Sequence, residues 1–236
     1  MLKRTFFLSL IIFAFTGCSE LQTILDSAAG PTNEEVASGL KEALNMGVST
    51  GTDALSARDG YFKSAYKILL PAEARKVTDK LRVIPGFSDL ENVIIEKINR
   101  GAEDAATKAK PIFINAIKSM TISDVMNVLL GPDDAATQYL KKATYNSLYG
   151  EFHPVIINSL NKFNAINLWS DAVNTYNKLP LVSRVNPDLD KYVTDQALDG
   201  LFKMVAQEEK EIRRDPVKRI TELLRKVFAK QDGNRS

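Results

Sequence analysis

The chain has 236 residues, 44% hydrophobic and 25% charged, which is typical of a folded domain and excludes a disordered or collagen-like chain. Its net charge of +2 comes from Lys3 and Arg4, because residues 1–17 contain no Asp or Glu and the rest of the chain is neutral. A neutral body argues against nucleic-acid binding, which needs a basic surface to neutralise phosphates.

Residues 1–18 have the pattern of a lipoprotein signal peptide. The two basic residues precede an apolar stretch from Phe6 to Phe15, which has the length of a signal h-region and is too short to span a membrane. Small residues follow, and then Cys18, the only cysteine, so the stretch resembles a lipobox. We expect cleavage before Cys18, followed by acylation of its thiol and of its new amino group. The alternatives are an ordinary signal peptide or a buried N-terminal helix with an incidental cysteine.

Acylation of Cys18 would hold the protein on a membrane, because two or more acyl chains anchor stably where one is marginal. In known lipoprotein sorting rules, an Asp after the lipidated cysteine directs the protein away from the outer membrane. Here Ser19 follows Cys18, so resemblance to these rules favours the outer membrane, with the protein facing the periplasm. We therefore expect a signal peptide over 1–17, a lipidated tether over 18–32 and one helical domain over 33–230. A single cysteine also excludes an intrachain disulfide and a Cys-based metal cluster.

The first helix is predicted from residue 33 to about residue 55. Thr32 and Glu35 have the spacing of a capping box, and apolar residues then recur every four positions, which predicts one buried stripe. Three glycines in this helix indicate close packing against another helix or a fraying end. They are Gly39, Gly47 and Gly51.

Residues 56–70 are less regular and rich in aromatic side chains. Pro71 suits the first turn of a helix that should reach about Val83, before Pro85 and Gly86 break the chain.

A second capping box is predicted at Ser88 and Glu91, at the start of a long helical pattern that continues to Ile117. Pro111 should kink or split this helix near Lys110, because proline lacks an N–H and clashes with the preceding turn.

The remaining patterns are also helical. Thr121 and Asp124 predict the cap of a short helix that ends at Leu130, and Asp215 with Pro216 predicts the start of the last helix. The other expected helices cover 133–148, 152–163, 166–178, 188–213 and 216–230. Since no convincing period-two alternation occurs, we predict an all-α fold in a single compact, bundle-like domain.

His153 is the only histidine, so a multi-histidine metal site is excluded. We interpret it as structural. A Ser-His-Asp triad stays an alternative, although the chain has no Gly-x-Ser-x-Gly elbow. Once Cys18 is acylated, no cysteine nucleophile remains.

Two acidic groups are candidates for catalysis or cation binding. Asp133 and Asp134 could act as an acid–base pair or bind a cation, but negative charge at a helix N-terminus explains them more simply. Glu208–Glu211 precedes two arginines, and the pair from Glu209 to Arg213 is interpreted as part of a solvated helical face.

Six aromatic residues gather in the middle third of the chain. They could line a groove for an apolar ligand, but filling the core of a helical domain is the favoured interpretation. They are Tyr139, Tyr145, Tyr149, Phe152, Phe163 and Trp169.

Several short segments occur in one characteristic order. They are GLKEAL at 39–44, AKP at 109–111, AIKSM at 116–120, DDAATQY at 133–139, LDKYVT at 189–194, ALDGLF at 197–202, IRRDP at 212–216 and LLRKVF at 223–228. Together they resemble the bacterial exported-protein family catalogued as domain of unknown function 4197, over roughly residues 33–229. The resemblance implies an all-helical exported domain, often behind a signal peptide or lipobox. It implies no activity, so no catalytic residue is carried over.

The recognisable segments contain ten polar residues that either cap helices and bond between them or line one shared site. They are Asp134, Thr137, Gln138, Tyr139, Asp190, Tyr192, Thr194, Asp199, Glu208 and Arg213.

The preferred functional hypothesis is a non-enzymatic envelope lipoprotein whose helical domain binds a protein or an apolar ligand, or supports the envelope. No cofactor is expected. A hydrolase is a second hypothesis, and it needs Asp133, Asp134 or Glu208–Glu211 to converge around a cation. A carrier of a hydrophobic molecule is a third, and it needs an apolar cavity of at least a few hundred cubic ångströms, roughly the usual scale of ligand pockets.

Overall fold

The computed structural model describes residues 32–162, 164–186, 188–219, 221–223, 225 and 227–228. The predicted signal peptide, Cys18 and the tether as far as residue 31 lie outside this part. Within it the chain forms eight α-helices, one 3-10 turn and no strand, which confirms the all-α prediction.

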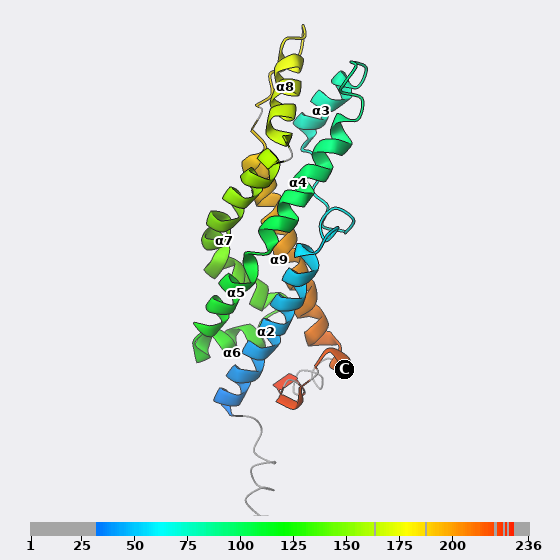
Figure 1. Cartoon of the computed structure of the whole chain (residues 1–236). Helices are drawn as coiled ribbons and strands as arrows, with labels where there is room; N and C mark the ends of the chain where they lie inside the picture. Colours follow the sequence, from blue (N-terminus) through cyan, green and yellow to red (C-terminus); the bar gives the residue numbers. More distant parts are fainter. Residues whose placement is uncertain are drawn as a thin grey trace, which may run out of the picture.

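The helices pack side by side in one elongated bundle (Figure 1). Helix α7 packs along α4 and α9, and α2 packs against α9, α5 and α6. Helices α3 and α8 contact each other at one end of the bundle, and α6 lies at the other end with the start of α2. The bounds are α2 (Asn33–Ser56), α3 (Ala72–Leu81), α4 (Leu90–Ala106), α5 (Ala109–Lys118), α6 (Ile122–Leu130), α7 (Ala135–Lys162), α8 (Ala165–Asn177) and α9 (Asp190–Arg214).

The two ends predicted from capping boxes at Thr32 and Thr121 are confirmed. The Thr32 N–H donates to the Glu35 carboxylate at 2.8 Å, and the Glu35 N–H donates back to the Thr32 hydroxyl at 3.2 Å. Thr121 and Asp124 make the same reciprocal bonds at the start of α6. Each box supplies partners to backbone N–H groups that the first helical turn leaves free.

The glycines of α2 mark close packing, as one of the two interpretations predicted. A methyl group on Gly51 would come within 3.0 Å of Met204 in α9, and one on Gly47 within 3.5 Å of Ile212. On Gly39 it would come within 2.8 Å of Val227. The absence of side chains along this stripe lets α2 approach α9 and the C-terminal segment.

The irregular segment between α2 and α3 is held by two side chains of α4. Asn99 accepts a hydrogen bond from the Ile68 N–H and donates one to the Ile68 carbonyl, both at 2.8 Å. The Glu103 carboxylate accepts the N–H groups of Tyr61 and Phe62 at 3.2 and 3.1 Å. These bonds replace the regular ladder that the segment lacks, since buried backbone groups need partners.

Two details of the predicted helix starts are wrong. The residue before α4 is Asp89 and makes no side-chain cap bond, so Ser88 and Glu91 form no capping box. Instead the Glu91 carboxylate accepts the Thr78 hydroxyl of α3 at 3.3 Å. Pro71 lies one position before the first turn of α3.

The split of the long helix is confirmed, but it occurs earlier than expected. Helix α4 ends at Ala106 and α5 begins at Ala109, so the break precedes Lys110. Pro111 is then the third residue of α5, where its missing N–H would have had no helical partner.

The prediction of separate helices over 133–148 and 152–163 is wrong, because α7 runs unbroken through Pro154. Leu148, Phe152 and Ile156 are all fully buried on one face of α7. Packing of this face against α4 and α9 outweighs the hydrogen bond that the proline removes.

The last predicted helix is only partly confirmed. The Asp215 carboxylate accepts the Val217 N–H at 2.9 Å, as expected for an N-cap, but the element it caps is a single 3-10 turn over Pro216–Lys218. Further helical residues occur between 222 and 228. The segment predicted as one helix over 216–230 therefore does not form one from its first residue.

Candidate functional site

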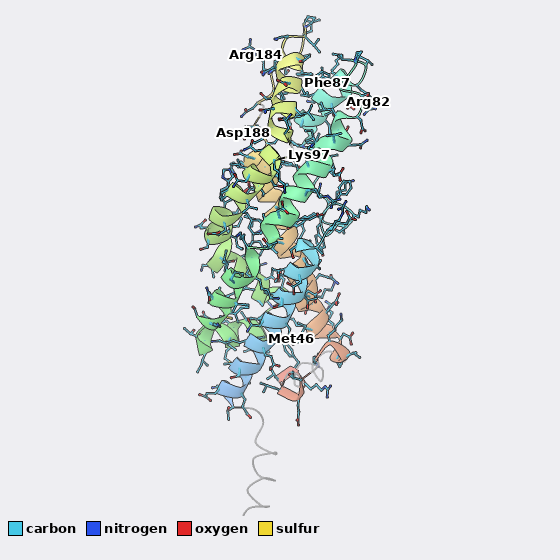
Figure 2. The ribbon with its side chains drawn as sticks, viewed as in Figure 1. Met46, Arg82, Phe87, Lys97, Arg184 and Asp188 are labelled. Atoms are coloured by element: carbon cyan, nitrogen blue, oxygen red, sulfur yellow. The ribbon has the colours of Figure 1, made fainter. Side chains whose placement is uncertain are left out.

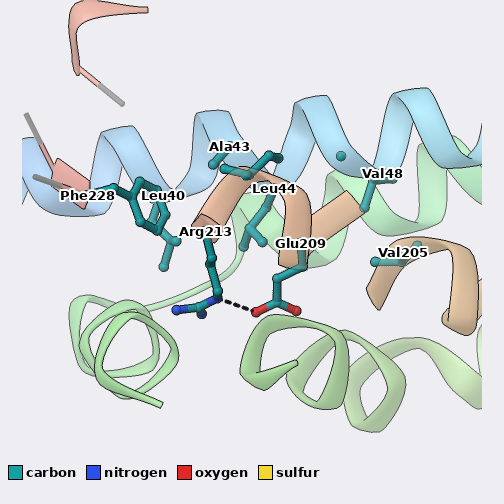
Figure 3. A pocket seen from close by; sticks show the side chains of 10 residues that line it. Leu40, Ala43, Leu44, Val48, Val205, Glu209, Arg213 and Phe228 are labelled. Carbon is teal, nitrogen blue, oxygen red and sulfur yellow. Dashed lines mark hydrogen bonds and ion pairs between the residues drawn. The ribbon is translucent and has the colours of Figure 1, made fainter. Parts of the chain in front are cut away.

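An ion pair lies inside the end of the bundle that contains α6. The Arg213 Nε donates to the Glu209 carboxylate at 2.9 Å, and both side chains are almost completely buried (Figure 3). The interpretation of this pair as part of a solvated face is therefore wrong. Glu209 lies one turn beyond the buried Val205 on α9, so its position in the apolar stripe turns it into the bundle.

Helix ends complete the environment of this pair. The Glu209 carboxylate accepts the Thr137 N–H and hydroxyl, both at 2.8 Å, at the start of α7. Arg213 donates to the Val128 carbonyl at 2.8 Å, in the last turn of α6. The acid meets the positive end of one helix dipole and the base meets the negative end of another. Through these hydrogen bonds, the pair links the end of α6 and the start of α7 to α9.

A small cavity beside this pair has a volume of about 20 Å³. It is lined mainly by apolar residues of α2 and α9, together with Phe228 (Figure 3). That is roughly the space one water molecule needs, so the cavity is too small for an organic ligand. The Glu209–Arg213 pair is best explained as a structural element.

A second cavity, of about 310 Å³, lies among α4, α7, α8 and the first residues of α9. Its volume is at the lower end of the roughly 300–1,000 Å³ range of small-molecule pockets. Ile166 and Asp188 at its border are exposed, so it reaches the protein surface. Its walls are mostly aliphatic and include Ile94, Ile98, Ile157, Leu160 and Ala165.

Trp169 lines this second cavity and is the only tryptophan of the chain. Its side chain is 3% exposed, and its indole N–H is buried without a hydrogen-bond partner. A buried donor without a partner is costly to the fold. Trp169 was predicted as a core aromatic; it is buried, and it also faces the open volume.

Two carboxyl groups lie at the border of the cavity, where α9 begins. The Asp190 N–H donates to the carboxylate of Asp188, which is labelled in Figure 2, at 3.2 Å. The Asp190 carboxylate lies 2.9 Å from His153 Nε2. The interaction with the neighbouring Asp190 carboxyl raises the pKa of Asp188, and the interactions with Asp188, the Lys191 N–H and His153 lower the pKa of Asp190. Tyr149 stacks on the His153 ring at 5.5 Å. Asp188 is therefore the more readily protonated of the two acids.

The ten polar residues that the sequence suggests lie in α7 or directly before it, and in α9. Thr137 and Arg213 meet at Glu209, and Asp190 lies at the second cavity. Asp134, the residue directly before α7, accepts a hydrogen bond from the Gln138 side chain at 2.9 Å.

The other five have separate partners or surroundings. The Tyr192 hydroxyl donates to the Leu69 carbonyl, the Thr194 hydroxyl donates to the Asp190 carbonyl, and Asp199 pairs with Lys203. Tyr139 is partly buried, which raises the pKa of its hydroxyl. Burial raises the pKa of Glu208 as well, and Glu211 adds to that effect.

Three of the acids considered for a hydrolase are each paired with a cation: Asp133, Glu209 and Glu211. Asp133 accepts from Arg214 Nε at 2.8 Å, and Glu211 lies 3.0 Å from Lys218 Nζ. Within the described ranges, no group of three or more His, Cys, Asp or Glu side chains is placed to hold a metal ion.

Three important residues were missed or misread in the sequence. The apolar spacing of α9 could have placed Glu209 in the core. No local pattern distinguishes Asp188, because its cavity is built from four separate segments. Arg219 is buried and donates to the carbonyls of Ile212 and Arg213 at 3.1 and 2.8 Å, closing the 3-10 turn onto α9.

No single helix in the described part of the chain has the length and apolar character of a membrane span. A bent pair of segments, Leu90–Lys118 and Ile122–Leu130, meets these two criteria when taken together.

A family model for proteins of unknown function, DUF4197, matches residues 30–229. The chain belongs to this family. This confirms the resemblance seen in the sequence, and the DUF4197 match spans every helix from α2 to α9, with the second cavity and the Glu209–Arg213 pair. Comparison with curated proteins and with solved structures gave no match.

Proposed function

We propose that this protein is an envelope lipoprotein, anchored through Cys18 in the outer membrane and facing the periplasm, whose helical body binds a small apolar molecule. The observation that carries the binding role is the cavity of about 310 Å³ with Trp169 in its wall. Its aliphatic lining favours an apolar molecule, and Trp169 adds an aromatic side chain to the wall.

The resemblance of the sequence before Cys18 to a lipobox supports the proposed anchor, and the fold supports the separation of anchor and cavity. Helix α2, which follows the tether, begins at the end of the bundle opposite to α3 and α8 (Figure 1). Because α8 forms one wall of the cavity, the binding site would lie away from the attachment point. A molecule could then enter while the body stays tethered.

The anchor is tested by mass spectrometry of the protein purified from the membranes of its native host. We expect a mature N-terminus at Cys18 that carries acyl chains, and an uncleaved, unacylated product from the variant Cys18→Ser. An unacylated Cys18 in the native protein would overturn the proposed anchor.

Ligand binding is tested separately on the helical domain without its lipid anchor, with 1-octanol as an uncharged probe. Since Trp169 is the sole tryptophan and lines the cavity, its emission should change saturably during the titration. Flat emission, together with no heat of binding by calorimetry, would overturn the binding role.

Two variants that fill the cavity make the test specific. Ala165→Leu and Ser170→Leu each add side-chain volume to its wall, and we expect octanol affinity to fall by about tenfold or more, equivalent to at least about 1.4 kcal/mol. Ala143→Leu, on an exposed position of α7, is the matched control and should bind like the unmodified protein. Equal binding by all variants would place the probe elsewhere.

A further inference from the structure

We infer that the second cavity selects apolar molecules that carry a basic amino group over molecules of the same length that carry a carboxylate. This inference rests on the proposed ligand binding and specifies its chemical class. It follows from the polar groups that the cavity offers at its border.

The charge at the border of the cavity is negative. Asp188 and Asp190 both contribute to the lining, and the Asp188 carboxylate accepts the Asp190 N–H at 3.2 Å, which places the two acids side by side. The ionisable groups that act on Asp188 are Asp190 and His153, and His153 is engaged with Asp190 at 2.9 Å. A ligand ammonium would relieve the repulsion between two neighbouring carboxylates, whereas a ligand carboxylate would add to it.

Of the two acids, Asp188 is the one that a ligand in the cavity can reach. Asp190 is bonded to His153 and to the Lys191 N–H, and its side chain is partly buried. Asp188 is exposed at the border of the cavity. Lys191, the neighbouring cation on α9, is already paired with Asp195 at 2.6 Å. Asp188 is therefore the group we assign to the ligand amine.

The presence of Trp169 in the wall is also compatible with a cation that has an apolar body. Its indole ring is part of the cavity wall, and aromatic faces attract ammonium groups when both are shielded from water. The wall thus combines an aliphatic surface, an indole and a carboxylate, which together suit an amine with a short hydrocarbon chain.

The test compares octylamine, 1-octanol and octanoate at pH 7, each titrated below its micellar range while Trp169 emission is followed. We expect octylamine to bind about tenfold or more tightly than octanol, and octanoate to bind most weakly. Asp188→Asn keeps a side-chain oxygen that can accept the Asp190 N–H but removes the charge. It should reduce octylamine affinity to that of octanol and leave octanol unchanged. Asp199→Asn, on a separate exposed ion pair of α9, should change neither.

A salt titration of the unmodified protein provides a measurement that needs no variant. Octylamine binding should weaken from low to high NaCl, because screening reduces charge–charge attraction, whereas octanol binding should not. Equal affinities for the three probes, or tighter binding of octanoate, would overturn the amine preference but leave apolar binding intact. If none of the three binds, the proposed binding function fails together with this inference.

Discussion

Glu209 and Arg213 are joined by an ion pair 2.9 Å long that is almost entirely removed from solvent. The helix ends of α6 and α7 supply their remaining hydrogen bonds. Such a pair gains little over apolar side chains of the same size, but it leaves a costly orphan charge when one member is lost. It therefore specifies how α6, α7 and α9 meet.

The first prediction concerns that orphan charge. Arg213→Met leaves Glu209 buried without its counter-ion and should lower the free energy of unfolding by about 3–5 kcal/mol in urea titrations. Asp53→Asn, which breaks the exposed pair with Lys110, is the control and should cost no more than about 1 kcal/mol. Similar losses for both would show that burial of the pair is energetically unimportant.

The second prediction concerns the anchoring of the segment between α2 and α3. Asn99→Ala removes the partners of both backbone groups of Ile68, so it should destabilise the protein by about 1–3 kcal/mol. The control is Asn92→Ala, at an exposed position of the same helix, which should change the stability by less than about 0.5 kcal/mol. Thermal unfolding of the two variants measures the difference, and matching melting temperatures would refute the anchoring role.

The third prediction contrasts two glycines. A methyl group on Gly200 would lie 2.8 Å from the ring of Tyr61, which is fully buried and whose hydroxyl donates to the Ala197 carbonyl. Gly200→Ala should therefore destabilise by about 1–3 kcal/mol through overpacking. Gly150 in α7 has open space around it, and Gly150→Ala should stabilise by about 0.5–1 kcal/mol. The contrast fails if both substitutions change the unfolding midpoint in the same direction.

The fourth prediction is a pair of opposite pH effects. The Thr121 N–H and hydroxyl lower the pKa of Asp124, so the stability from this cap is complete above the unfolded pKa of about 4 and is lost as the pH falls through the lower folded pKa. Burial and Glu211 raise the pKa of Glu208, so its ionised form destabilises the fold at pH 7.

Urea unfolding of two variants between pH 3 and pH 7 measures both effects. Asp124→Ala should be less stable than the unmodified protein at pH 7, and that deficit should shrink toward pH 3. Glu208→Gln should be more stable at pH 7, and its advantage should disappear as the pH falls below about 4, where the unfolded carboxyl also becomes protonated. A pH-independent difference for either variant would contradict the assigned cause.

The sequence alone determined the helical class, most helix positions and the family. The caps at Thr32 and Thr121 were predictable because a capping box joins residues three positions apart. The stripe of α2 was predictable because every fourth position faces the same side of a helix. Both signals are local, so they do not depend on what the helix packs against.

Tertiary structure decided the features that join distant segments. Pro154 stays inside α7 because the neighbouring side chains of the helix are buried. Glu209 lies in the core because it accepts hydrogen bonds from the start of α7, while Arg213 donates to the end of α6. The cavity beside Trp169 has walls that are more than 90 residues apart in the sequence, from Ile94 to Asp190. An empty volume is a property of how helices fit together, and the spacing of residues along any one helix does not encode it.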